Sequence, residues 1–276
     1  ETIIAGKGSD IMMGRGGSDN YKILQGDTIE YEDVGGVSEM KKGDYGVAGD
    51  VINEIGGSSA DKSDSITLSS VTNIDQLSFS RTQIKYEDWS NTLKIDVDYD
   101  SATKSIDDTI YVFDHYNQDL GFRAVEKLYL DDGWDSDEIW NLVTGETTGS
   151  ILETIDSYTG TDAQDILMAG IYDSVLTGGD GKDILIGENF ENFTMDTTFV
   201  MGTDEGWDKI ADMIQNFGTG DKLDLSNLGI TEADVVTAVG DNLLVNDEVV
   251  AEFSSFNNEL TLDQILLEEN GHLIYG

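Results

Sequence analysis

Large apolar residues recur every nine positions in two parts of the chain. Leu167, Leu176 and Leu185 have this spacing in the middle, and Met12 and Tyr21 have it near the start. Each follows a short polar residue by two positions, and that alternation is typical of a strand with one buried face. One strand of three or four residues cannot bury such a face alone. The spacing therefore predicts stacked repeats that share a core.

Glycine and aspartate complete the repeat. Residues 178–186 (GGDGKDILI) carry glycine at the first, second and fourth positions, Asp183 at the sixth and Leu185 at the eighth. Glycine permits close approach of the main chain, so carbonyl oxygens can turn inward beside the Asp183 carboxylate. Ca²⁺ takes ligands of this kind, and the unit is interpreted as a calcium loop. Weaker copies occupy residues 5–13, 14–22, 160–168, 169–177 and 187–195.

The pattern predicts a parallel β-roll in which each unit is half a turn. Units 18 residues apart then stack on the same edge, so a Ca²⁺ ion fits between the loops of Asp165 and Asp183. The opposite edge is poorer in charge, because Ser174 and Asn192 stand at the sixth position there.

The two aspartates of the first block, Asp10 and Asp19, are nine apart and belong to opposite edges. We expect the first block to stack on the second, with Asp10 or Asp19 completing a site beside residues 160–165. Asp204 and Asp208 belong to a final irregular turn, where they either hold a terminal Ca²⁺ or cap a turn. The candidate calcium ligands are Gly6, Gly8, Asp10, Gly17, Asp19, Gly160, Asp162, Asp165, Gly179, Asp180, Gly181, Asp183, Asp204 and Asp208.

These units resemble the GGxGxDxUx nonapeptides of the RTX (repeats-in-toxin) family over residues 1–22 and 157–195. The resemblance implies a calcium-bound β-roll in an exoprotein that a Gram-negative bacterium secretes by the type I route or holds at its surface. Tyr172 and Ser174 depart from the pattern at one loop, which puts calcium there in doubt.

Between the two blocks the nine-residue register disappears. Alternating residues predict strands over 65–69, 76–81, 92–99, 109–113 and 125–130. Residues 135–143 suggest a short helix with Ile139 and Leu142 inward. LSFSR (77–81) and residues 121–134 also resemble a small domain found between RTX blocks.

The expected organisation therefore has four parts. Residues 1–22 are the first roll block, 23–156 an inserted β-rich domain, 157–210 the second block, and 211–276 a small α+β cap. The predicted fold class is mainly β: a parallel β-roll interrupted by the insert.

The C-terminal cap has recognisable local signals. Thr231 and Asp234 suggest the start of a helix that ends at Gly240, residues 242–246 and 249–253 suggest a hairpin across 247–248, and Thr261 with Gln264 caps a last helix. Residues 220–276 are similar to the C-terminal ends of RTX proteins. That resemblance implies an uncleaved secretion signal and the type I secretion machinery as a partner.

Charge decides which partners are excluded. The chain has 56 acidic and 15 basic residues, a net charge of −41, yet 38% of its residues are hydrophobic. Nucleic acid and anionic membranes repel such a surface, and no apolar run approaches the roughly 20 residues of a membrane span. Self-repulsion favours a monomer, and bound divalent cations would let so acidic a chain fold.

Other candidate chemistry has a simpler interpretation. Asp96, Asp98 and Asp100 imitate an EF-hand start, but their alternation with apolar residues favours an exposed acidic strand face. His115 and His272 lie too far apart in sequence for a zinc motif, and both are expected at the surface. The four tryptophans are expected in the core rather than stacked on sugar: Trp89, Trp134, Trp140 and Trp207.

HExxH and GxSxG are absent, so we expect no enzyme activity of the chain itself. With 56 acidic residues, the sequence does not exclude a pair of carboxylates of the kind that glycosidases use. The sequence is interpreted as the calcium-binding C-terminal module of a type I-secreted exoprotein, most readily a cell-surface adhesin of the ice-binding or biofilm kind. The chain begins inside a repeat, so we expect it to be a piece of a larger protein. The alternatives are a sugar- or peptide-binding insert and the non-catalytic tail of an RTX hydrolase.

Overall fold

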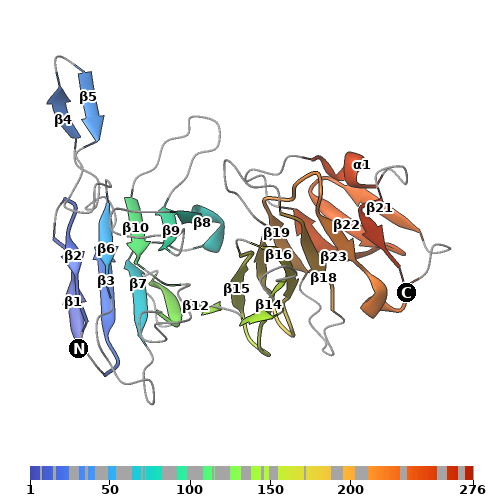
Figure 1. Ribbon diagram of the computed structural model, residues 1–276, viewed down its shortest axis with the longest axis horizontal. Helices are drawn as coiled ribbons and strands as arrows, with labels where there is room; N and C mark the ends of the chain where they lie inside the picture. Colours follow the sequence, from blue (N-terminus) through green and yellow to red (C-terminus); the bar gives the residue numbers. More distant parts are fainter. Residues whose placement is uncertain are drawn as a thin grey trace. The chain divides into compact units, whose positions relative to one another are not determined.

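The fold divides into two compact units, Glu1–Leu142 and Val143–Gly276 (Figure 1). The computed structural model describes residues 1–6, 8–14, 17–24, 31–34, 37–40, 49–53, 64–69, 71, 73–82, 92–97, 108–113, 115, 125–131, 138–143, 146–148, 155–170, 172–187, 195–202, 211–230, 235–253, 260–266 and 271–275. Among these residues, no helix combines the length and apolarity needed to cross a membrane.

The first unit is built from short strands joined by connections of unequal length. They are β1 (Thr2–Ile4), β2 (Ile11–Met12), β3 (Asn20–Leu24), β4 (Tyr31–Val34), β5 (Val37–Met40), β6 (Asp50–Ile52), β7 (Ser65–Ser69), β8 (Leu77–Thr82), β9 (Thr92–Val97), β10 (Asp108–Val112), β11 (Lys127–Asp131) and β12 (Glu138–Val143), with a 3₁₀ turn at Ile74–Gln76.

Its strands form two parallel ladders. One contains β1, β3, β7 and β11, and the other contains β2, β6 and β10. β8 and β9 extend the second ladder antiparallel, and β12 pairs antiparallel with β11. Early strands alternate between the ladders, which confirms the predicted parallel β-roll.

The boundary expected after residue 22 does not interrupt the sheet. β3, from the first repeats, pairs in parallel with β7 from the expected insert, and Asn20 lies opposite Ser65. Asp50 and Asp64 each begin a roll strand in the manner of Asp10 and Asp19. The roll therefore continues into the region expected as a separate domain, although the nine-residue spacing is lost there.

The strands expected between residues 65 and 130 are found within two residues of their predicted ends. The helix expected over 135–143 is wrong, because residues 138–143 form β12. Trp140 and Leu142 are buried while Ile139 is 43% exposed, so the side chains alternate with a period of two. Pairing with β11, where Leu128 lies opposite Trp140, fixes this segment as a strand.

The second unit continues the same design. Its strands are β13 (Glu146–Thr148), β14 (Ile155–Thr159), β15 (Asp165–Met168), β16 (Asp173–Thr177), β17 (Ile184–Ile186), β18 (Thr197–Val200), β19 (Asp212–Gln215), β20 (Lys222–Asp224), β21 (Val236–Val239), β22 (Asn242–Val245), β23 (Glu248–Phe253) and β24 (Leu273–Ile274). A 3₁₀ turn (Ser226–Leu228) and helix α1 (Leu262–Ile265) complete it. One parallel ladder runs β14, β16, β18, β20, β24, and the other runs β15, β17, β19, β23.

The core of the second unit lies between these ladders. Leu167, Leu176 and Leu185 are fully buried in one cluster, as their eighth position in the repeat predicts. Phe217 closes the cluster, with its ring centroid 5.5 Å from that of Phe199 and 5.7 Å from that of Phe253. Met12 and Tyr21, the eighth-position residues of the first unit, are buried as well.

The C-terminal part confirms two local predictions and corrects a third. The hairpin β22–β23 is present, but Asn246 and Asp247 form its turn with φ values of 50° and 69°. The capping box of α1 joins Thr261 and Gln264 as expected. The helix expected to end at Gly240 is wrong, because Val236–Val239 is strand β21. Its β-branched residues suit the antiparallel pairing with β22.

Candidate metal centre

The expected calcium loops are stacked directly on one another. Ile166 pairs with Ile184 in register, so the loop of residues 160–165 lies against that of residues 178–183. The Asp165 main-chain N–H donates to Asp183 Oδ1 at 2.9 Å, and both aspartates are fully buried. The predicted 18-residue stacking is therefore confirmed at this edge.

The glycines have no side chain, so main-chain and carboxylate oxygens can pack directly against them. A Cβ atom at Gly160 would lie 1.9 Å from the Gly178 carbonyl oxygen, and one at Gly178 would lie 2.1 Å from Asp183 Oδ2. At the fourth position of the repeat, Gly8, Gly17 and Gly181 have φ values of 92°, 100° and 110°. Only glycine adopts this conformation at little cost.

The donor set fits a hard cation. The carbonyl oxygens of Thr161 and Ala163 face glycines of the next loop, beside the carboxylates of Asp165 and Asp183. Ca²⁺ takes six to eight oxygen ligands and accepts main-chain carbonyls. Groups of three or more His, Asp or Glu side chains that could hold a metal are not found among the described residues. A cation in these loops would therefore depend on carbonyl oxygens with one carboxylate from each loop.

Side chains at the sixth position also close their own loops. Asp165 Oδ2 accepts a hydrogen bond from the Thr161 N–H at 2.5 Å, and Asp10 Oδ2 accepts one from the Gly6 N–H at 2.8 Å. Ser174 Oγ accepts the corresponding N–H of Gly170 at 2.9 Å. Serine thus keeps the loop closed without supplying a negative charge.

A second set of hydrogen bonds links each turn to the next. In six pairs of the described residues, a main-chain N–H donates to a carboxylate oxygen from a later turn. The pairs are Asp10 to Asp50, Asp19 to Asp64, Asp64 to Glu126, Asp165 to Asp183, Asp183 to Asp212, and Thr197 to Asp221, at 2.7–3.1 Å. One exposed pair runs the other way, since the Asp196 N–H donates to Asp173 Oδ1 at 3.1 Å.

The structure corrects the expected register after residue 186. Thr197, not Asn192, stacks on Ser174, and it lies 23 residues further along the chain. Asp212 provides the carboxylate next to Asp183. Asn192, Asp204 and Asp208 are outside the described residues.

Sequence reasoning missed two carboxylates, Asp212 and Asp221, although a signal for them was present. Asp212-Met213-Ile214 and Asp221-Lys222-Leu223 share the aspartate, any residue, large apolar triplet of the repeat, and they are nine residues apart. Their loops lack the adjacent glycines that mark the full repeat at residues 178–186.

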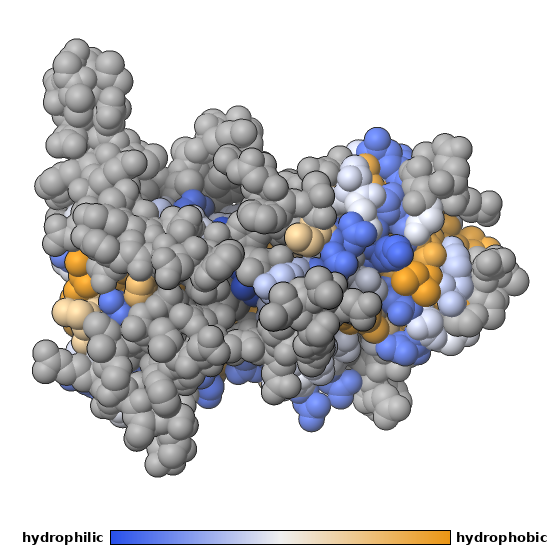
Figure 2. Space-filling view, in the orientation of Figure 1, coloured by the Kyte–Doolittle hydropathy of each residue, from blue (hydrophilic) through white to orange (hydrophobic). Residues whose placement is uncertain are grey.

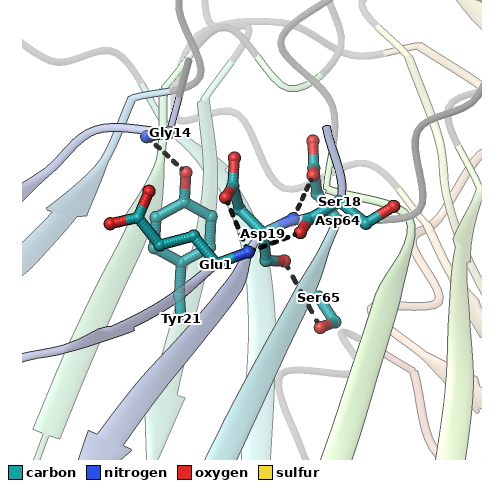
Figure 3. A network of polar contacts seen from close by, with 7 residues as sticks. All are labelled: Glu1, Gly14, Ser18, Asp19, Tyr21, Asp64 and Ser65. Carbon is teal, nitrogen blue, oxygen red and sulfur yellow. Dashed lines mark hydrogen bonds and ion pairs between the residues drawn. The ribbon is translucent and has the colours of Figure 1, made fainter. Parts of the chain in front are cut away.

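In the first unit Asp19 takes part in the same kind of turn-to-turn hydrogen bond, as Figure 3 shows. Its N–H donates to Asp64 Oδ1 at 2.8 Å, and the Glu1 amino group lies 2.9 Å from the Ser18 carbonyl oxygen and 3.3 Å from Asp19 Oδ1. Asp19 is 4% exposed, and its Oδ2 accepts no hydrogen bond. A buried carboxylate oxygen that accepts no hydrogen bond is a favourable ligand for a cation.

The neighbours of Asp10 and Asp19 correct another expectation. They were expected to complete a site beside residues 160–165, but their partners are Asp50 and Asp64, from the region expected as an insert. Of the remaining candidate ligands, Asp162 and Asp180 are exposed on their loops.

Both histidines are buried, contrary to expectation. His115 is 2% exposed, and burial together with the nearby Arg81 charge lowers its pKa to about 3. His272 is 6% exposed, and its Nδ1 lies 2.8 Å from the Asp221 carbonyl oxygen, to which it donates. His272 also lies edge-on to the ring of Phe217, while His115 Nδ1 accepts a hydrogen bond from the Val125 N–H at 3.4 Å.

The expected acidic strand face is also wrong at Asp96, which is buried and accepts hydrogen bonds from Thr109 Oγ1 at 2.8 Å and from Lys94 Nζ. Burial and the Asp96 charge raise the pKa of Tyr111. Asp98 and Asp100 lie outside the described residues. Trp140 is in the core as expected, while Trp89, Trp134 and Trp207 are outside the described residues.

Comparison with known proteins agrees with the metal chemistry of the loops. The sequence family of the RTX calcium-binding nonapeptide repeat matches residues 1–21 and 159–193, in 4 copies. RTX nonapeptides bind calcium, so Ca²⁺ is the metal for these loops. Asp212 and Asp221 lie beyond the matched residues.

Comparison with curated protein sequences gives no match. Among solved structures, the crystal structure of extracellular lipase LipA from Serratia marcescens is similar over 100% of this chain and 40% of the lipase chain, with 15% identity and a TM-score of 0.27. The chain thus corresponds to less than half the length of that lipase.

Proposed function

We propose that the chain is a calcium-dependent folding module of an exoprotein that a Gram-negative bacterium exports by the type I route. The stacked loops of residues 160–165 and 178–183 carry this proposal. Their carboxylates are buried 18 residues apart in register, and a side chain at Gly160 or Gly178 would collide with the oxygens around them.

Calcium acts in this proposal through linkage between binding and folding. Asp165, Asp183 and the carbonyl oxygens of Thr161, Ala163 and Gly178 would hold the ion, which supplies positive charge to an acidic chain. An ion that binds only the folded state at 100 times its dissociation constant adds about 2.7 kcal/mol to the free energy of unfolding. Calcium-poor cytoplasm then leaves the chain unfolded, and millimolar calcium outside the cell lets it fold.

A calcium titration tests the folding switch. Far-UV circular dichroism of the chelator-treated chain should show a cooperative gain of β structure with Ca²⁺, at about 10⁻⁴ to 10⁻³ M, and none with Mg²⁺. Asp183→Asn should move the midpoint to higher calcium, whereas Asp241→Asn, which removes the same charge from an exposed turn, should not. A chain that is fully folded in chelator would contradict the proposal.

The cellular role extends this proposal. Residues 220–276 would direct export, with the type I secretion machinery as partner, and the parent protein would be a cell-surface adhesin. The RTX-like repeats and their metal chemistry support an exported protein. Fusion of residues 220–276 to a reporter, in cells with and without type I machinery, tests the signal. Equal export of a scrambled segment would contradict it.

A further inference from the structure

The three-stranded antiparallel part of the second unit has an apolar face toward solvent. Thr237 lies opposite Leu244, and Leu244 lies opposite Val249, so these side chains share one face of the sheet. Alternation along β21 places Val235 and Val239 on the same face. Val235, Val239 and Val249 are 62%, 61% and 42% exposed. We call these five residues the outer face.

The reverse side of the same strands is already occupied. Leu243 and Ala251 are fully buried in the core of the second unit, with Val245 and Phe253 beside them. Antiparallel sheets with one core-facing side usually carry polar residues on the other side. Here the other side is largely apolar as well, with Thr237, Asn242 and Glu252 as its polar members. Figure 2 shows apolar surface interrupting the hydrophilic surface over the C-terminal part of this unit.

The outer face adjoins the edge of a sheet. β21 is the last strand in the order β23, β22, β21, and among the described residues no strand pairs with its other side. An edge strand presents main-chain N–H and C=O groups that an added strand can use. An extended partner segment beside β21 would form those hydrogen bonds and continue the apolar row with every second side chain.

Charge around the outer face selects the partner. Asp241, Asp247 and Glu248 are exposed at the ends of the strands, whereas Glu252 lies 3.9 Å from Lys182 Nζ and already has a basic partner. A second copy of the chain would bring the same acids together across a two-fold axis, in a protein of net charge −41. A partner with lysine or arginine beside its apolar residues would instead be attracted.

We propose that the outer face and the free edge of β21 form a docking surface for an extended protein segment in which apolar and basic residues alternate. This interaction goes beyond the calcium-dependent folding proposed above, because none of the outer-face residues belongs to a repeat loop. The partner's valine-sized side chains pack on Val235 and Val239, and its basic side chains reach the surrounding acids.

The test uses the full chain in saturating calcium and the peptide acetyl-Lys-Val-Lys-Val-Lys-Val-Lys-amide as the probe, with binding measured by isothermal titration calorimetry. The double variant Val235→Asp/Val239→Asp should bind the peptide at least tenfold more weakly. The direction of the change in affinity is diagnostic. The variant is more negative than the wild type, so it would bind the cationic peptide more tightly if the attraction were non-specific. Ile139→Asp, at an exposed apolar residue of the first unit, serves as the matched control and should not weaken binding.

Folding and partner identity are checked in the same experiment. Val235→Thr/Val239→Thr keeps β-branched residues on the strand and should still weaken binding several-fold if the aspartate variant fails to fold. Unchanged or tighter binding by a folded aspartate variant would overturn the proposal. So would equal binding of the peptide with glutamate in place of lysine, or a peptide-free dimer that the same substitutions dissociate.

Discussion

A close contact beside the Asp183 carboxylate gives a quantitative test of the packing in the calcium loops. Substitution of Gly178 by alanine would place a Cβ atom 2.1 Å from Asp183 Oδ2 and 2.9 Å from its Cγ. Asp183 is fully buried and accepts the Asp165 N–H, so its carboxylate cannot move without losing that hydrogen bond. Gly178 has no positive φ, and the expected cost is therefore steric alone.

The magnitude follows from two contributions. Overpacking of a well-packed interior costs about 1–3 kcal/mol, and the loss of a hydrogen bond to a charged group costs about 1.5–3 kcal/mol more. Gly178→Ala should therefore lower the free energy of unfolding by about 3 kcal/mol or more. At about 2–4 °C per kcal/mol for a unit of this size, the melting temperature should fall by roughly 6–12 °C.

Gly202→Ala is the matched control. Its Cβ atom would lie 3.7 Å from the Gly179 carbonyl oxygen, an ordinary van der Waals distance, and Gly202 also has no positive φ. It should leave the melting temperature unchanged or raise it slightly, because alanine restricts the unfolded chain. Thermal unfolding of both variants, followed by circular dichroism in saturating calcium, measures the difference. Equal melting temperatures would refute the packing described for residues 160–183.

Further predictions concern single residues. His115→Gln should make the free energy of unfolding of the first unit depend less on pH in acid, as measured by urea unfolding at pH 4–7. In the wild type the folded ring resists protonation down to about pH 3, while the unfolded ring takes a proton below about pH 6.5. The wild type therefore loses about 1.4 kcal/mol of its free energy of unfolding per pH unit as the pH falls between these two values. Asp212→Ala should cost about 1–3 kcal/mol in thermal unfolding, because the Asp183 N–H loses its acceptor. Phe217→Ala should cost about 3–5 kcal/mol in the same assay, since the ring is fully buried between Phe199 and Phe253.

The sequence predicts the parts of the fold that local pattern determines. The eighth-position apolar residues, the stacking of residues 160–165 on 178–183 and the α1 capping box all appear as expected. The first two depend on residues within one repeat or 18 positions apart, so the nine-residue pattern encodes them directly. The capping box depends on two residues three positions apart.

Register across longer loops could not be predicted in the same way. Ser174 and Thr197 stack although the chain between them is five residues longer than two repeats. Lengthening a surface loop costs little free energy, and neither composition nor periodicity records where the extra residues lie. Asp212 and Asp221 follow such a longer connection and also lack the adjacent glycines of the repeat, although the triplet that each begins survives.

The two helices wrongly expected show the limit of short periodic segments. β12 and β21 span only six and four residues, and pairing with β11 and β22 decides their conformation. Periodicity distinguishes a helix from a strand poorly at that length. Burial of His272 likewise depends on neighbours distant in sequence, since its ring contacts the Asp221 carbonyl oxygen and Phe217.

The turn-to-turn hydrogen bonds give the roll a polarity. In all six buried or partly buried pairs the carboxylate belongs to the later turn, so each turn is completed by the one that follows it. Removal of turns from the front leaves the remaining donors of this set with their carboxylate acceptors, although main-chain donors such as the Val51 N–H lose their carbonyl acceptors. Removal from the back strips the carboxylate acceptor from the turn before. The roll should therefore tolerate shortening from its N-terminal end better than shortening from its C-terminal end, because only the second leaves these amides without a carboxylate acceptor.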